Sequence, residues 1–245
     1  PTNYSSLKTA RVLAMGMSQF EEQNPLPAVP TELSTIVKDL SFAKAQGTPL
    51  VGLWDGKSFL NEAFTLDNLR SQRQSYPYSI IHLATHAEFQ PGKPESSYIQ
   101  LWNEKLLLDR VRQLGWDDPP VELLVLSACR TAVGDTESEL GFAGFAIQAG
   151  VKSVLASLWY VSDEGTLGLM SEFYYQLLQR EVTIKSEALR QAQVAMIRGE
   201  VRLADGHLVW HKGALPLPTE LSSLPDRDLS HPYYWSGFTM VGSPW

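Results

Sequence analysis

Short apolar runs alternate with helical or loop segments along most of this chain, and the alternation restricts the choice of fold more than any other feature. Runs of this length and composition are typical of strands buried in a parallel sheet. The expected strands are residues 11–17, 48–54, 78–86, 121–129, 153–161 and 235–241. Strands that alternate with helices predict an α/β three-layer sandwich with a mainly parallel central sheet.

Helical periodicity accounts for much of the remaining sequence. Apolar residues recur at helical spacing from Thr31 to Ala45, and Gly47 is expected to end that helix. Thr65 and Ser162 are expected to cap the starts of two further helices. Other segments complete the prediction: helices at 108–114, 141–149 and 183–197, and a β-hairpin made of 98–102 and 105–108.

Residues 199–230 show little periodicity and contain scattered Pro, Gly and His. A stretch of this length without secondary structure is unusual in a compact domain. We therefore expect an irregular insertion loop, which could be a lid, a disordered segment or a site of self-cleavage. Arg202, Lys212 and Arg227 are the basic residues at which self-cleavage is predicted if the enzyme prefers a basic residue.

The composition limits the class of protein. The 245 residues suit one large domain over 1–245, and the net charge of −7 argues against a general nucleic-acid binder. The sequence has no apolar run near 18 residues, which argues against a membrane span, and its single cysteine cannot form an internal disulfide. These features favour a cytoplasmic protein. Because the chain begins at Pro1, we expect a fragment of a longer protein with a further N-terminal domain.

Two expected strands end in residues that can carry out thiol chemistry. Cys129 ends the run 121–129, and His86 ends the run 78–86. The carboxyl ends of parallel strands meet at the edge where α/β proteins bind ligands, so a nucleophile and an acid–base group are expected there together. The alternative is a buried cysteine that acts only as a small hydrophobic residue, and an edge histidine bonded to backbone.

A carboxylate is predicted beside this pair. Asp163 follows the strand 153–161, and a carboxylate at that edge could hold a basic substrate side chain by a charge-assisted hydrogen bond. Glu164 and Asp135 are weaker candidates for the same role. The alternative is that the acids at 163 and 164 only complement the helix dipole.

The other histidines are given structural roles. His82 lies four residues before His86 on the same strand, so the two are about 13 Å apart and are not a metal pair. We expect His82 to be a core histidine. His207 and His211 repeat the spacing, but no Cys or carboxylate cluster supports a metal site, and neither a metal nor a cofactor is expected. The sequence also lacks the glycine-rich phosphate loops and the G-x-S-x-G nucleophile elbow.

Three segments in order, 82–89 (HLATHAEF), 125–135 (VLSACRTAVGD) and 156–163 (ASLWYVSD), resemble the CHAT family of caspase-like domains, which are usually attached to TPR repeats. The segments 187–193 and 231–238 are similar to it as well. The arginine after the cysteine and the ending 242–245 are most similar to the HetF-type cyanobacterial branch.

This resemblance implies a caspase-hemoglobinase fold and a Cys/His dyad of Cys129 and His86. It implies an oxyanion hole made by the backbone N–H groups of Ala87 and Cys129. The run 158–163 is similar to a separase segment that carries the acid of the S1 pocket, so Asp163 is expected at the floor of that pocket, with Arg or Lys as the P1 residue of the substrate. Ala87 stands where the family often has Gly, and Arg130 where many members have Glu.

The sequence therefore predicts a cysteine endopeptidase that cleaves a protein or peptide substrate after a basic residue through a thioester. TPR repeats in the full-length chain and a role in bacterial cell differentiation are implied by the resemblance alone. The alternative is a caspase-like scaffold that binds proteins without cleaving them.

Overall fold

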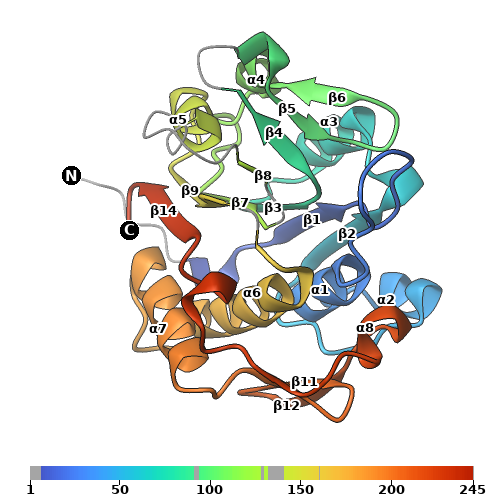
Figure 1. Ribbon diagram of the computed structural model, residues 1–245. Helices are drawn as coiled ribbons and strands as arrows, with labels where there is room; N and C mark the ends of the chain where they lie inside the picture. Colours follow the sequence, from blue (N-terminus) through green and yellow to red (C-terminus); the bar gives the residue numbers. More distant parts are fainter. Residues whose placement is uncertain (1–6, 91–93, 128–129, 132–140, 160, 245) are drawn as a thin grey trace.

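A six-stranded sheet forms the centre of the protein (Figure 1). The computed structural model describes residues 7–90, 94–127, 130–131, 141–159 and 161–244. In spatial order the strands are β14 (Phe238–Gly242), β9 (Ser153–Ser157), β7 (Leu123–Leu126), β3 (Ile80–Ala84), β1 (Val12–Gly16) and β2 (Gly56–Leu60). All neighbours pair in parallel except β14, which runs antiparallel to β9. The predicted mainly parallel α/β sandwich is confirmed.

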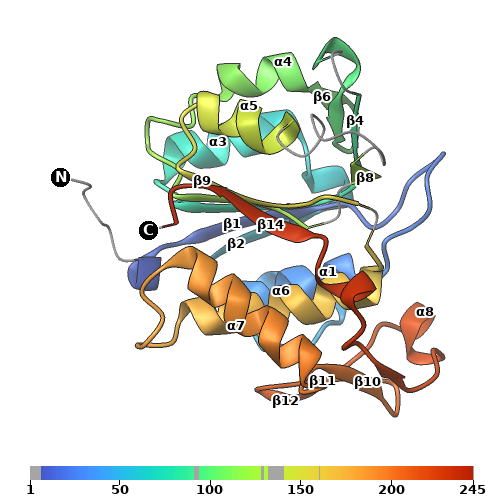
Figure 2. The same ribbon diagram turned by 60° about the vertical axis from the view of Figure 1, so that its left-hand side comes forward.

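Helices cover both faces of this sheet (Figure 2). One layer holds α3 (Leu66–Ser75), α4 (Leu108–Val111) and α5 (Gly141–Gln148), and the other holds α1 (Val29–Ile36), α2 (Leu40–Gln46), α6 (Asp163–Leu177) and α7 (Lys185–Ile197). Alternate residues of β1 enter the two layers: Leu13 and Met15 join one apolar core, and Val12 and Ala14 join the other. Short 3₁₀ turns lie at Leu7–Thr9, Asn61–Ala63, Pro94–Ser96, Arg112–Leu114 and Pro232–Tyr234.

The prediction of one helix over 31–45 is wrong, because two helices occupy this stretch. Asp39 accepts a hydrogen bond from the Phe42 N–H and so caps the start of α2. Val37 is extended and bridges to Trp54. Gly47 has a φ of 64° and ends α2 as predicted.

The second strand lies at 56–60 instead of 48–54. Pairing with β1 begins where Gly56 meets Val12, and a Cβ at Gly56 would lie 1.9 Å from the Val12 carbonyl oxygen. Only glycine permits this close approach. Before that point Trp54 makes a single isolated bridge, so residues 48–54 do not form a strand.

A second sheet stands beyond the carboxyl ends of β3 and β7. Its order is β6 (Lys105–Leu107), β5 (Tyr98–Gln100), β4 (Ala87–Phe89) and β8 (Arg130–Thr131). The pair β5 and β6 is the predicted hairpin. β4 continues the chain after β3, and β8 continues it after β7, so this sheet extends the two strands that were predicted to carry the site.

The prediction of an irregular loop at 199–230 is wrong. The segment forms a third sheet in the order β12 (Gly213–Pro216), β11 (His207–Trp210), β10 (Arg202–Ala204) and β13 (Arg227–Asp228), together with the short helix α8 (Thr219–Ser222). Strands of two to four residues are too short to show periodicity. Their buried side chains join the core around α6, and they include Leu203, Leu208, Trp210 and Leu215.

In the part of the chain that the structure describes, no helix combines the length and the apolar character that crossing a membrane requires.

Candidate active site

His86 lies in the connection between β3 and β4, at the carboxyl edge of the central sheet. Its carbonyl oxygen accepts a hydrogen bond from the Gln100 N–H at 2.9 Å, and the hydroxyl of the preceding Thr85 donates to the Gln100 carbonyl oxygen at 2.9 Å. The residue is 6% exposed. The β5 strand therefore fixes the backbone of His86, and the side chain is largely shielded from water.

The His86 ring contacts the segment that follows β1. Its Nε2 atom lies 2.8 Å from the Asn24 carbonyl oxygen, and the centroid of the ring is 4.5 Å from that of Phe20. A carbonyl oxygen can only accept, so Nε2 carries the proton in this contact. In the neutral ring Nδ1 is then the nitrogen that can accept a proton.

Cys129 and Asp135 lie outside the described residues. The registers of the chain on both sides of Cys129 are nevertheless defined. Leu126 pairs with Leu83 before it, and Arg130 pairs with Glu88 after it. The paired strands β3 and β7 thus come directly before His86 and Cys129 in the chain, and the paired strands β4 and β8 come directly after them. Ala87 opens β4 opposite Ile99 and is 2% exposed.

Asp163 is the first residue of α6, directly after the N-cap Ser162, whose hydroxyl accepts from the Gly165 N–H. Its Oδ2 atom accepts a hydrogen bond from the Ala28 N–H at 2.7 Å. The pKa of this carboxyl is raised to about 7, mainly by burial; the Ala28 N–H opposes the rise, and the nearby carboxylates of Glu32 and Glu164 contribute to it. Near neutral pH the group is thus divided between its charged and neutral forms.

Glu164 is already paired within the chain. Its Oε1 atom accepts from Nη1 of Arg227 at 2.9 Å, and this contact joins α6 to β13. Glu164 is thus tied to a charged side chain, whereas Asp163 accepts a hydrogen bond from a backbone N–H.

The segment 18–28 belongs to the site, and sequence reasoning did not identify it. Through main-chain atoms it contacts both predicted side chains: Asn24 contacts His86, and Ala28 contacts Asp163. Pro residues in 24–30 are typical of a turn. They carried no information about what the turn would contact, because the contacting atoms are common to all residues.

The remaining histidines are structural. His82 is fully buried, with Nδ1 3.2 Å from the Tyr174 hydroxyl and Nε2 3.0 Å from Oε1 of Glu32, which confirms the prediction of a core histidine. The contact with Glu32 is short but is not directed as a hydrogen bond. His207 contacts the Asp205 carbonyl oxygen, and His211 contacts Glu172. Over the residues with described positions, no group of three or more His, Cys, Asp or Glu could hold a metal ion.

The comparison with known families gives one match. Residues 2–243 match the CHAT domain. The chain belongs to the CHAT domain family. This CHAT domain is therefore a caspase-like domain related to the clan CD cysteine peptidases, and its six-stranded sheet is consistent with the caspase-like fold. A search of curated proteins found no match.

Proposed function

We propose that this CHAT domain is a cysteine endopeptidase that cleaves its substrate after Arg or Lys, with Cys129 as nucleophile and His86 as acid–base. The observation that supports this most is the contact between His86 Nε2 and the Asn24 carbonyl oxygen. It holds the ring at the carboxyl edge of the sheet through Nε2. The strand registers that flank His86 and Cys129 support the same pairing.

The reaction has two stages. In the first, the Cys129 thiol gives its proton to Nδ1 of His86, and the sulfur attacks the carbonyl carbon of the scissile bond. The N–H groups of Ala87 and Cys129 stabilise the charge on the oxygen. The C–N bond then breaks, the leaving amine takes the proton from Nδ1, and a thioester remains.

In the second stage water attacks the thioester carbon and gives one proton to Nδ1 of His86. The C–S bond breaks, the sulfur recovers the proton from Nδ1, and the carboxylic acid product leaves. No metal or cofactor takes part in either stage. Because a carbonyl holds Nε2, the same nitrogen of His86 serves as base and as acid throughout.

Asp163 is proposed to select the basic side chain. A guanidinium or ammonium group near this carboxyl would stabilise its charged form and form a charge-assisted hydrogen bond. The Ala28 N–H holds Oδ2 of Asp163 in place and uses one of its two lone pairs. Oδ1 and the second lone pair of Oδ2 remain to accept hydrogen bonds from the substrate.

Cleavage of quenched peptides with Arg, Lys, Asp or Leu at P1 tests this proposal. Wild type is expected to cleave after Arg and Lys. Cys129→Ala should abolish cleavage, and Asp163→Ala should lower kcat/KM for Arg at least about 100-fold while changing the Leu peptide little. Asp67→Ala, which removes an exposed carboxylate on α3, is the matched control.

A wild type that cleaves none of the four peptides, and whose Cys129 reacts with iodoacetamide no faster than a free thiol, would contradict the proposal. It would favour the alternative of a non-catalytic scaffold. The TPR repeats, the cytoplasmic location and a HetF-type role in cell differentiation stay predictions that rest on sequence.

A further inference from the structure

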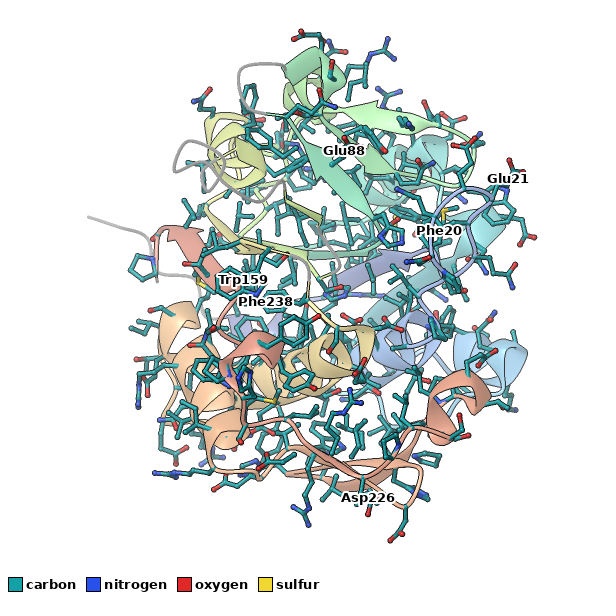
Figure 3. All side chains as sticks on the ribbon, in the orientation of Figure 1. Phe20, Glu21, Glu88, Trp159, Asp226 and Phe238 are labelled. Atoms are coloured by element: carbon teal, nitrogen blue, oxygen red, sulfur yellow. The ribbon has the colours of Figure 1, made fainter. Side chains whose placement is uncertain are left out.

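The order of strands in the central sheet arranges the site along a line. Asp163 follows β9, Cys129 follows β7, His86 follows β3, and the segment 17–23 follows β1. Neighbouring strands are about 4.8 Å apart. Two neighbouring positions on this line are therefore separated by at least about the length of one residue of a bound peptide. The segment 17–23 therefore lies on the other side of His86 from the end of β9, from which the chain leads to Asp163. In Figure 3, Trp159, which follows β9, and Phe20, which follows β1, are labelled on opposite sides of the view.

A cavity of about 590 Å³ lies on the β1 side of His86. It is formed between the segment 17–23 and the β5–β6 hairpin. Three aromatic side chains, Phe20, Tyr98 and Trp102, line it together with polar and charged residues. The Lys105 ammonium lies 4.0 Å from the centre of the Tyr98 ring, and Glu21 and Glu22 are exposed at the cavity. Its volume is in the range of sites that hold small ligands or several side chains.

Two residues of the cavity wall also contact His86. The Phe20 ring packs against the His86 ring at 4.5 Å between centroids. The Gln100 N–H donates to the His86 carbonyl oxygen. The cavity therefore adjoins the acid–base residue directly. A bound peptide that runs from Asp163 past His86 would enter it.

The direction of the substrate follows from the proposed function. If the P1 side chain points toward Asp163, the residues that follow the cleaved bond lie on the far side of His86. We infer that the cavity between the segment 17–23 and the β5–β6 hairpin binds these leaving-side residues and prefers an aromatic or long aliphatic side chain. This inference rests on the proposed function for the direction of the chain, but the binding itself does not require catalysis.

The lining supports this chemistry. Aromatic rings bury apolar side chains with large contact areas, and Phe20 and Trp102 are only partly buried, so they retain surface for contact. The carboxylates of Glu21 and Glu22 attract positive charge, which is present on the new amino group once the bond is cut. The cavity is therefore suited to the amino-terminal end of the leaving product.

A kinetic experiment separates this inference from the proposed function. Two quenched peptides share Arg before the cleaved bond and differ only in Phe or Gly at the first two positions after it. The ratio of kcat/KM for the Phe peptide to that for the Gly peptide is expected to be about tenfold in wild type and to fall toward one in Trp102→Ala. Trp159→Ala makes the same change on the other side of the dyad and should keep the wild-type ratio.

A Phe-to-Gly ratio of one in wild type would overturn the inference, and so would a ratio that falls as much in Trp159→Ala as in Trp102→Ala. Cleavage after Arg would still support the proposed function in either case.

Binding gives a readout that does not depend on catalysis. The leaving product Phe-Phe-Ala-amide, with a free amino group, is titrated into the Cys129→Ala protein, and indole N–H signals are followed by NMR. The Trp102 signal, assigned by Trp102→Phe, is expected to shift with saturation while that of Trp159 stays in place. The absence of a saturable shift at Trp102 would overturn the inference even if the protein proves to be a peptidase.

Discussion

The Asn24 carbonyl oxygen lies 2.8 Å from Nε2 of His86, although 62 residues separate the two in the chain. This contact assigns the protonated nitrogen of the imidazole, because a carbonyl cannot donate. His207 provides the opposite case, since its Nδ1 atom lies 2.7 Å from the Asp205 carbonyl oxygen.

The first prediction concerns the tautomers of these two rings. Long-range ¹H–¹⁵N NMR spectra at pH 8.5 should show the proton on Nε2 of His86 and on Nδ1 of His207. Assignment uses His86→Gln and His207→Gln. A proton on Nδ1 of His86 would contradict the geometry and the acid–base role that was derived from it.

The second prediction concerns pH and stability at Asp163. The folded pKa is about 7 and the reference value is 3.8, so between these values the folded state holds a proton that the unfolded state has lost. Stability therefore falls as pH rises from about 4 to about 7. Asp163→Asn has no carboxyl to ionise and so lacks this loss of stability. We expect the variant to be more stable than wild type by about 2 kcal/mol at pH 8. This is half of the value that the pKa shift would give by itself, because the side chain is partly solvated.

Urea unfolding at pH 4.5 and pH 8 measures this difference, which should fall to about a quarter at the lower pH. Asp67→Asn serves as the control for the change of side chain itself. An Asp163→Asn variant that is less stable than wild type at pH 8 would show that the charged carboxylate is favourable in the folded protein.

The third prediction concerns a buried carboxylate behind the site. Glu172 is fully buried, and its Oε1 atom contacts Nδ1 of His211 at 2.8 Å and Nε2 of Gln176 at 2.6 Å. His211→Ala removes one of these partners, and we expect a loss of about 1–3 kcal/mol in the free energy of unfolding. The same change at His207, in the same strand region, should cost less than about 0.5 kcal/mol. Equal losses in the two variants would mean that the contact between His211 and Glu172 does not contribute to the free energy of unfolding.

The fourth prediction tests how closely the third sheet packs on α6. A Cβ at Gly168 would lie 2.9 Å from Cγ1 of Val201. Gly168→Ala is expected to lower stability by about 1–2 kcal/mol despite the better helix propensity of alanine. In the double variant with Val201→Ala, this cost should largely disappear, since the clashing methyl group is gone. Additive losses in thermal unfolding would show that the two positions are not in contact.

The sequence was sufficient to predict the buried strands β1, β3, β7 and β9, because continuous apolar runs and their order carry the architecture, but it placed β2 too early in the chain. It was insufficient at 31–45, where the apolar residues keep helical spacing although the helix is interrupted. Val37 is extended there, and the Asp39 side chain starts a new helix by capping it. It also missed the third sheet, in which apolar contact with α6 decides the structure of strands too short for periodicity.

For the site, residue type was informative only where side chains carry the chemistry. His86 and Asp163 were visible as polar residues after apolar strands, and both lie at the carboxyl edge of the sheet. The role of Asn24 and Ala28 was not visible, because main-chain atoms make both contacts. The cavity near Phe20 was not visible either, since it arises where two segments about 80 residues apart come together.

The contacts of Asn24 and Ala28 have a consequence for how this region tolerates change. Asn24 uses only its carbonyl oxygen and its side chain is exposed, so most substitutions there should leave its contact in place, whereas Ala28 is fully buried and accepts few larger side chains. A deletion or insertion of one residue between them would instead shift one carbonyl or one N–H along the backbone by about 3.5 Å, so that His86 and Asp163 could not both be satisfied. The length of this short stretch, more than its composition, is what ties the acid–base group to the specificity group.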